Sequence, residues 1–230
     1  MLREIINLYH PEGFTDNSWT GMGRDWICHC PHCREKFARE VGLDLPRHVD
    51  WEDADYRRWI KWSYACRVEI WELNNRVTQE QGGPDCLWLG MIHGDPIHSH
   101  LAFCDLEQIG ARSVMWMSDQ QSRNVTGFAQ NGLSGKLLHD VLGWNAVIPE
   151  SMATYVRGEQ AFRKAANPAL ETRKWMVEGY AGGISPWWHH VGAYQGDRRQ
   201  FQTVEPLTRW RRGRSGPPPP GPASPARPVR

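Results

Sequence analysis

The sequence predicts an α/β fold of about five strand–helix units, equivalent to a partial (β/α)8 TIM barrel that lacks its first three units. Short apolar runs alternate with segments of helical periodicity, which is typical of parallel sheets. Each apolar run ends in a polar or aromatic cluster, where such a barrel carries its active site. The alternative is a doubly wound open sheet, but no glycine-rich dinucleotide-binding motif follows any of the runs.

The first half of the chain is expected to contain a helix, a strand, a loop and a long helix. Residues 2–9 have a helical pattern that stops at Pro11, and residues 13–17 have the pattern of a short strand. Residues 18–33 are expected to form a loop. A long helix is expected over about residues 50–81, because apolar residues recur there every three or four positions.

The second half is expected to repeat short strands and helices. Strands are expected at residues 86–92, 113–117, 145–148 and 180–185. Helices are expected at about residues 106–109, 136–142 and 152–178. These units place residues 1–210 in one domain.

Residues 211–230 are expected to form a disordered tail, because a segment of arginines and seven prolines cannot bury a core. The chain has a net charge of +1, and residues 209–230 hold six arginines and no acid, so residues 1–208 carry a charge of −5. A mildly acidic body is not typical of nucleic-acid binding.

No apolar run approaches the ~20 residues that span a bilayer, and Arg3 and Glu4 interrupt any signal-peptide pattern. We therefore expect a cytoplasmic protein without nucleic-acid or membrane partners, whose oligomeric state stays open.

The chain contains 13 tryptophans, an excess with two interpretations. Most are expected to pack in the core. A minority are expected to line a carbohydrate site, because an indole face packs on the C–H face of a sugar ring. Trp19, Trp187 and Trp188 are the candidates for sugar contacts, together with the neighbouring His189.

Two carboxylates follow expected strands and are the candidates for catalysis. Glycoside hydrolysis uses one carboxyl group as an acid and a second as a nucleophile or base. Asp16 follows the first strand and Glu150 follows the fourth, so we expect this pair to form a glycoside hydrolase site. The alternatives are a loop hydrogen bond for Asp16 and a helix-starting acid for Glu150. At the level of function, the alternative is an inactive carbohydrate-binding remnant of such a barrel.

Further polar residues follow two other strands. Asp119 is a reserve carboxylate for sugar contact, and its alternative role is an ion pair with Arg123. His93 is a candidate for hydrogen bonds to sugar hydroxyls. A metal site formed by His93 and His98 is weakly supported, because no third ligand stands at a firm spacing.

Three of the six cysteines crowd into a C-x-C-x-x-C motif of six residues, at Cys28, Cys30 and Cys33. This spacing favours one soft tetrahedral metal ion, zinc above all, in a structural role. The alternative is three reduced loop cysteines without a metal. A fourth ligand is not apparent, because His29 and His32 are tightly tethered between the cysteines. No organic cofactor is expected.

Several of these segments together resemble a known group of enzymes. The segments are Gly13–Asn17, Cys28–Phe37, Leu45 and Pro46 with Trp51, Pro149–Ser151 and Gly182–Trp188. Over roughly residues 1–210 the chain resembles (β/α)8-barrel glycoside hydrolases, near the hypothetical glycosyl hydrolase and family 42 β-galactosidase groups, with some likeness to α-L-fucosidases.

The resemblance implies that the chain holds barrel strands four to eight and is an N-terminally truncated copy. In family 42 a similar triple cysteine, with one earlier cysteine, holds a structural zinc. The fucosidases imply that Asp16 is the nucleophile and Glu150 the acid/base, whereas family 42 implies the reverse. Family 42 has Asn-Glu on strand four where this chain has Asp16-Asn17, so the sugar stays open.

Overall fold

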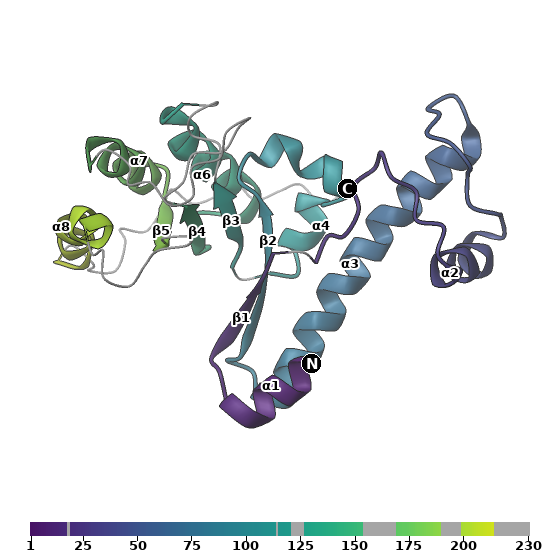
Figure 1. Cartoon of the computed structure of the whole chain (residues 1–230), viewed down its shortest axis with the longest axis horizontal. Coiled ribbons are helices and arrows are strands. Elements are labelled where there is room, and N and C mark those ends of the chain that lie inside the picture. The colour runs from purple at the N-terminus through teal and green to yellow at the C-terminus, as the bar shows by residue number, and fades with distance from the viewer. Residues whose placement is uncertain (18, 114, 121–126, 154–168, 190–198, 214–230) are drawn as a thin grey trace. The chain divides into compact units, whose positions relative to one another are not determined.

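The computed structural model describes residues 1–17, 19–113, 115–120, 127–153, 169–189 and 199–213. The chain divides into two compact units, each of which combines helices with strands (Figure 1). The first unit comprises Met1–Ile92 and Ile97–Ser113. The second comprises His93–Pro96 and Val114–Arg230. None of the described helices combines the length and apolar character that crossing a lipid bilayer requires.

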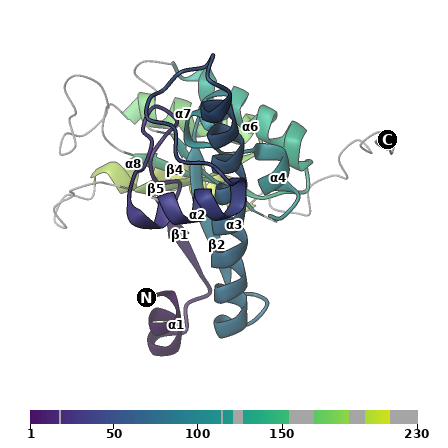
Figure 2. The same cartoon turned by 90° about the vertical axis from the view of Figure 1, so that its right-hand side faces the viewer.

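The first unit is organised around one long helix and a two-stranded parallel sheet. Its elements are α1 (Leu2–Tyr9), β1 (Gly13–Asp16), α2 (Pro31–Val41), α3 (Ala54–Gly82), β2 (Leu87–His93), the 3-10 helix η1 (Pro96–Ala102) and α4 (Leu106–Gly110). Strand β1 pairs in parallel with β2, with Gly13 opposite Leu87 and Asp16 opposite Gly90. The two views agree that α1 lies at the C-terminal end of α3 and α2 lies beside its N-terminal half (Figure 1, Figure 2).

Local sequence signals explain where these helices begin and end. Helix α2 begins with Pro31, whose fixed φ suits the first helical position, and ends before Gly42 at a φ of 77°. Helix α3 begins after Asp53, whose side chain accepts a hydrogen bond of 2.8 Å from the backbone N–H of Asp55. The expected long helix is therefore confirmed, whereas α2 was not expected as a helix.

Two aromatic clusters form the core of the first unit. Trp19, Trp71 and Trp88 pack edge to face, with ring centroids 5.1–5.8 Å apart. The rings lie so close to β2 that a Cβ on Gly90 would meet the Trp19 Nε1 atom at 2.6 Å. The second cluster joins α2 and α3 to the chain after η1 and contains Phe37, Leu45, Tyr56, Trp59 and Phe103.

The described part of the second unit holds a three-stranded parallel sheet and three helices. Its elements are β3 (Met117–Gln120), α6 (Ala129–Leu142), β4 (Ile148–Ala153), α7 (Ala169–Ala181), β5 (Ile184–His189) and α8 (Arg199–Gly213). Strand β4 pairs in parallel with both β3 and β5. Helices α6 and α7 approach closely, because Gly135 carries no side chain and admits the carbonyl oxygen of Gly182.

The expected partial (β/α)8 TIM barrel is wrong. The described strands form two small parallel sheets, one of two strands and one of three, and they do not close into a barrel. Helix α3, with 29 residues, is about 44 Å long, whereas the four-residue strand β1 spans only about 13 Å. Helix α3 is therefore much longer than the strands that it connects. In a barrel unit the helix and its strands have similar lengths, so β1, α3 and β2 do not form such a unit.

The last three strands begin three or four residues later than the sequence predicts. Residues 180–185 were expected as a strand, but Tyr180 and Ala181 end α7. The chain then turns at Gly182 and Gly183, which has a φ of 81°, before β5 begins. Residues expected just after strands, such as Asp119 and Glu150, therefore lie within them. Residues 154–168 of the expected helix 152–178, and residues 214–230 of the expected tail, lie outside the described residues.

Candidate metal centre

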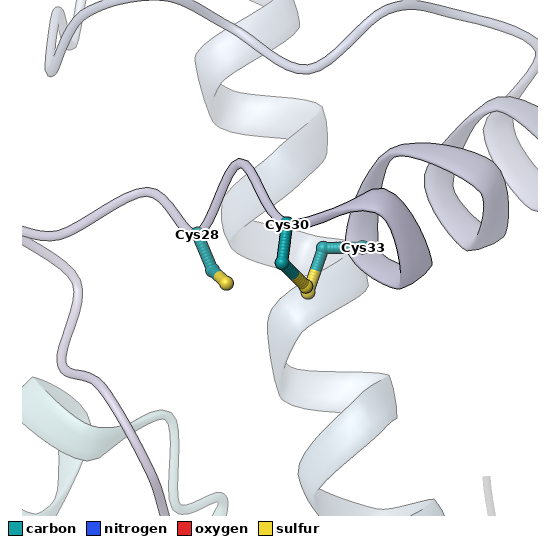
Figure 3. A group of neighbouring side chains, drawn as sticks. All are labelled: Cys28, Cys30 and Cys33. Atoms are coloured by element: carbon teal, nitrogen blue, oxygen red, sulfur yellow. The ribbon is translucent and has the colours of Figure 1, made fainter.

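Cys28, Cys30 and Cys33 come together in the first unit. Their sulfur atoms all lie within 4.8 Å of one another and could hold a metal ion. Cys28 lies on the loop before α2, Cys30 caps the helix, and Cys33 lies in its first turn (Figure 3). The helix start at Pro31 brings Cys30 and Cys33 to one side, because residues three apart share a helix face.

The electrostatics of the three thiols are uneven. The backbone N–H of Cys33, with further hydrogen bonds from the Cys33 and Cys28 side chains, holds the pKa of Cys30 below its ordinary value. Burial, followed by hydrogen bonds to Cys30 and Cys28, raises the pKa of Cys33 to about 12. Cys30 is therefore the thiol that most readily becomes a thiolate, and Cys33 keeps its proton. Near neutral pH, a cation among them is what favours all three as thiolates.

The loop that carries Cys28 is tied to the rest of the unit on several sides. Arg34 Nε donates to the carbonyl oxygen of His29 at 2.8 Å. Tyr56 donates its hydroxyl proton to the carbonyl oxygen of Arg24 at 3.0 Å, and Arg67 Nη2 donates to that of Met22, also at 3.0 Å. These bonds position the cysteines from helices α2 and α3.

Lys36 links the metal-site helix α2 to α3. Its Nζ atom lies 2.8 Å from Glu40 Oε2 and 2.8 Å from Glu69 Oε2, and it donates to Cys66 Sγ at 3.5 Å. The hydrogen bonds from Lys36 and Trp62 lower the pKa of Glu40 to about 2, against a small effect of burial. Glu40 also pairs with Arg39 at 2.9 Å, so two cations, Lys36 and Arg39, balance the two carboxylates.

A cavity of about 390 Å³ adjoins the cysteines. Cys28 and Cys33 line it, together with the aromatic rings of Trp26, Trp59, Trp62 and Phe103. The sequence interpretation missed this cavity. The helical spacing of Trp59 and Trp62 on α3 predicts that they face the same way, but a core and a cavity wall give the same spacing.

Arg67 and Lys36 are the two cationic residues that line this cavity in the described part of the chain. The Arg67 guanidinium lies 5.7 Å from the centre of the Phe103 ring, and its Nε–H is buried without a hydrogen-bond partner. Burial lowers the pKa of Arg67, and the thiols of Cys104, Cys66 and Cys33 oppose that shift. The arginine thus has sulfur atoms and an aromatic ring around it.

The two expected catalytic carboxylates lie on strands of different units. Asp16 is the last residue of β1 and is half-buried. Glu150 lies in β4, where its backbone pairs with Ser118 of β3 and Pro186 of β5. The side chain of Glu150 lies outside the described residues.

The candidate sugar-contacting residues have different environments. Trp19 is only 6% exposed and donates its Nε1–H to the carbonyl oxygen of Met91 at 2.7 Å, so both faces of its indole lie in the core. Trp187, Trp188 and His189 belong to β5, where they pair with residues 151–153, and their side chains are not described. His93 ends β2 and is exposed.

Asp119 and His93 do not join a metal cluster. Asp119 is half-buried in β3, opposite Ser151. His93 Nδ1 accepts a hydrogen bond of 3.1 Å from the backbone N–H of Asp95. In the described part of the chain, the cysteine trio is the one group of three or more side chains that could hold a metal ion. The expected partner of Asp119, Arg123, lies outside the described residues.

No protein-family model matches the chain, and no curated protein matches it. The likeness to glycoside hydrolases therefore rests on the motifs of the sequence.

Proposed function

We propose that this chain is a zinc-binding protein and that Cys28, Cys30 and Cys33 hold the ion. The observation that carries the proposal is the approach of the three sulfur atoms to within 4.8 Å. A tetrahedral zinc with Zn–S bonds of about 2.3 Å sets its sulfur atoms about 3.8 Å apart. The site therefore closes by small movements of side chains. Thiolate ligands favour zinc over hard cations such as magnesium and calcium.

The zinc has a structural role in this proposal. Cys28 comes from the loop, whereas Cys30 and Cys33 come from the start of α2. An ion bound by all three joins the loop to the helix and offsets the repulsion between neighbouring thiolates. The loop in turn contacts α3 through Arg67 and Tyr56, so the metal stabilises the packing of the first unit.

Elemental analysis of the purified chain tests this proposal. We expect one zinc per chain in the wild type and a large loss in Cys30→Ser. His32→Ala is the matched control, because His32 is exposed between the ligands and its imidazole does not join the cluster. The proposal fails if the wild type binds less than stoichiometric zinc under reducing conditions, or if Cys30→Ser and His32→Ala retain equal amounts.

Glycoside hydrolysis is a second candidate function. It is favoured by a half-buried carboxylate at the end of a parallel strand, Asp16, and by a second carboxyl group, Glu150, on another parallel strand. Two carboxyl groups are the minimum for this chemistry. The proposal uses these residues and the motif likeness, and it does not use a barrel.

A panel of aryl glycosides tests the second candidate. Fucoside, galactoside, glucoside and arabinoside substrates are compared with the wild type, Asp16→Asn and Glu150→Gln. We expect both substitutions to abolish turnover of the substrate that the wild type cleaves. Turnover that survives both substitutions removes this pair from the proposal, and sugar binding without turnover supports a carbohydrate-binding protein instead.

A further inference from the structure

The cavity beside the cysteine trio shares two of its walls with the metal centre. Cys28 and Cys33 line the cavity, whereas Cys30 does not. A zinc ion held by the trio therefore lies at the cavity wall. The volume of about 390 Å³ lies within the range of small-molecule sites.

The cysteine trio leaves one coordination position to another donor. Tetrahedral zinc takes four ligands, and structural sites usually complete the set from the protein. Only three ligand groups come together in the described part of the chain. Because two of the three face the cavity, a small molecule in the cavity can reach the fourth position.

The charges around the site favour a neutral donor. Zinc with three thiolates has a net charge of −1. Arg67 brings one positive charge, whereas Lys36 and Arg39 together balance Glu40 and Glu69. An anionic fourth ligand would bring the charge of this half-exposed centre to −2, against the single positive charge of Arg67. A neutral imidazole-type nitrogen completes the common Cys3His set without added charge.

The walls of the cavity favour a flat aromatic body. Trp26, Trp59, Trp62 and Phe103 supply ring faces and edges, against which planar rings pack well. The polar residues among its lining are Lys36, Ser63, Arg67 and Glu69, and Lys36 is already paired with Glu69. A ligand rich in hydroxyl groups would therefore leave several of them without partners. The cavity is therefore poorly suited to a sugar.

We propose that this cavity binds a flat heteroaromatic nitrogen base, whose ring nitrogen takes the fourth position on the metal held by Cys28, Cys30 and Cys33. This inference rests on the proposed zinc site. It adds a ligand to a centre that would otherwise be only structural, and it assigns Trp59 and Trp62 of α3 to ligand binding.

Benzimidazole and indole form a matched pair of probes. The two molecules have nearly the same shape, but only benzimidazole has a ring nitrogen with a free lone pair. Binding of each to the full chain is measured by titration calorimetry, with and without zinc, and zinc content is measured separately. We expect benzimidazole to bind the zinc-loaded chain at least about tenfold tighter than indole, and the preference to disappear without zinc.

Two further measurements separate coordination from ring packing. Trp26→Ala removes an exposed wall residue and is expected to weaken both probes by the same factor. In the cobalt-substituted chain, benzimidazole is expected to shift the visible d–d bands and indole is not. If zinc is bound but the two probes bind equally, or the cobalt bands do not respond, the heteroaromatic-base inference is wrong and the zinc proposal stands. If no zinc is bound, both are wrong.

Discussion

The indole Nε1–H of Trp19 donates a hydrogen bond of 2.7 Å to the carbonyl oxygen of Met91. The bond ties the segment after β1 to β2 in the first unit. It also places the Trp19 ring against Trp71 and Trp88, in a space that Gly90 leaves open. Trp19, which the sequence indicates as a candidate for sugar contacts, is therefore part of the core.

Trp19→Ala is expected to destabilise the chain by about 3–5 kcal/mol, because it removes a large buried side chain and leaves a cavity between two indoles. Chemical denaturation measures the change in the free energy of unfolding. Trp26→Ala is the control, since Trp26 is 69% exposed and its loss should change that free energy by no more than about 0.5 kcal/mol. Equal effects of the two substitutions would contradict the placement of Trp19 in the core.

The metal-free chain is expected to lose stability at alkaline pH through Cys33. Burial and hydrogen bonds to Cys30 and Cys28 raise the pKa of Cys33 from 9.0 to about 12 in the folded chain. The stability that this thiol contributes is fully present below pH 9 and is lost as the pH rises from 9 toward 12. Thermal unfolding across this range measures the loss. Burial also raises the pKa of Cys104 to about 12, so part of the decline should remain in Cys33→Ser. Cys33→Ser should decline less than the wild type, and equal declines in the two proteins would refute the assignment.

Zinc binding is expected to release protons. At pH 7 the Cys33 thiol holds its proton, because its pKa is about 12, and zinc binds only the thiolate. Calorimetry in buffers of different ionisation enthalpy should therefore detect at least one proton released per zinc bound. Binding without proton release would mean that Cys33 is not a ligand.

Gly135→Ala is expected to destabilise the second unit by about 1–3 kcal/mol. A methyl group on Gly135 would collide with the carbonyl oxygen of Gly182, and backbone atoms cannot yield as a flexible side chain can. Helix propensity alone would stabilise the variant by roughly 1 kcal/mol, so the sign of the change tests the close approach. Gly213→Ala, in a helix and with no neighbour near the added carbon, is the matched control. Both are measured by denaturant unfolding.

His139→Phe is expected to destabilise the second unit by about 1–3 kcal/mol. The imidazole is buried between the carbonyl oxygens of Gly143 and Gly183, each 3.1 Å from a ring nitrogen, and stacks on Trp144 at 4.4 Å. A neutral imidazole has one N–H, so the ring donates to one of these two carbonyl oxygens at a time. Phenylalanine keeps the stacking and loses that hydrogen bond. The exposed neighbour Asp140 is the control, and Asp140→Ala should change the unfolding midpoint little. A midpoint unchanged in His139→Phe would show that the hydrogen bond contributes no net stability.

The features that the sequence predicted well are short-range ones. The cysteine trio spans six residues, and the covalent distance between its members already limits how far apart their sulfur atoms can lie. The periodicity of α3 is likewise local, because each turn of a helix is set by its own residues. Pro31 and Gly42 are local signals of the same kind, and they mark the start and the end of α2.

The barrel prediction was wrong because the number of strands and the closure of the sheet depend on contacts between residues far apart in the chain. A run of apolar residues before a polar cluster looks the same at a barrel mouth and in a small open sheet. The start of β5 also differs from the prediction. Gly182 and Gly183 form a turn before it, and the position of that turn depends on where α7 ends.

Local features of the sequence predict that three thiols lie close enough for one metal ion, that a long helix follows them, and that short parallel strands alternate with helices. The burial of Trp19, and the cavity that Trp26, Trp59, Trp62 and Phe103 line beside the thiols, emerge only in the folded chain. Local spacing is set by the covalent chain. Burial depends on which segments pack together, and these can be far apart in the chain. Phe103, for example, packs against Trp59, which lies 44 positions earlier in the sequence.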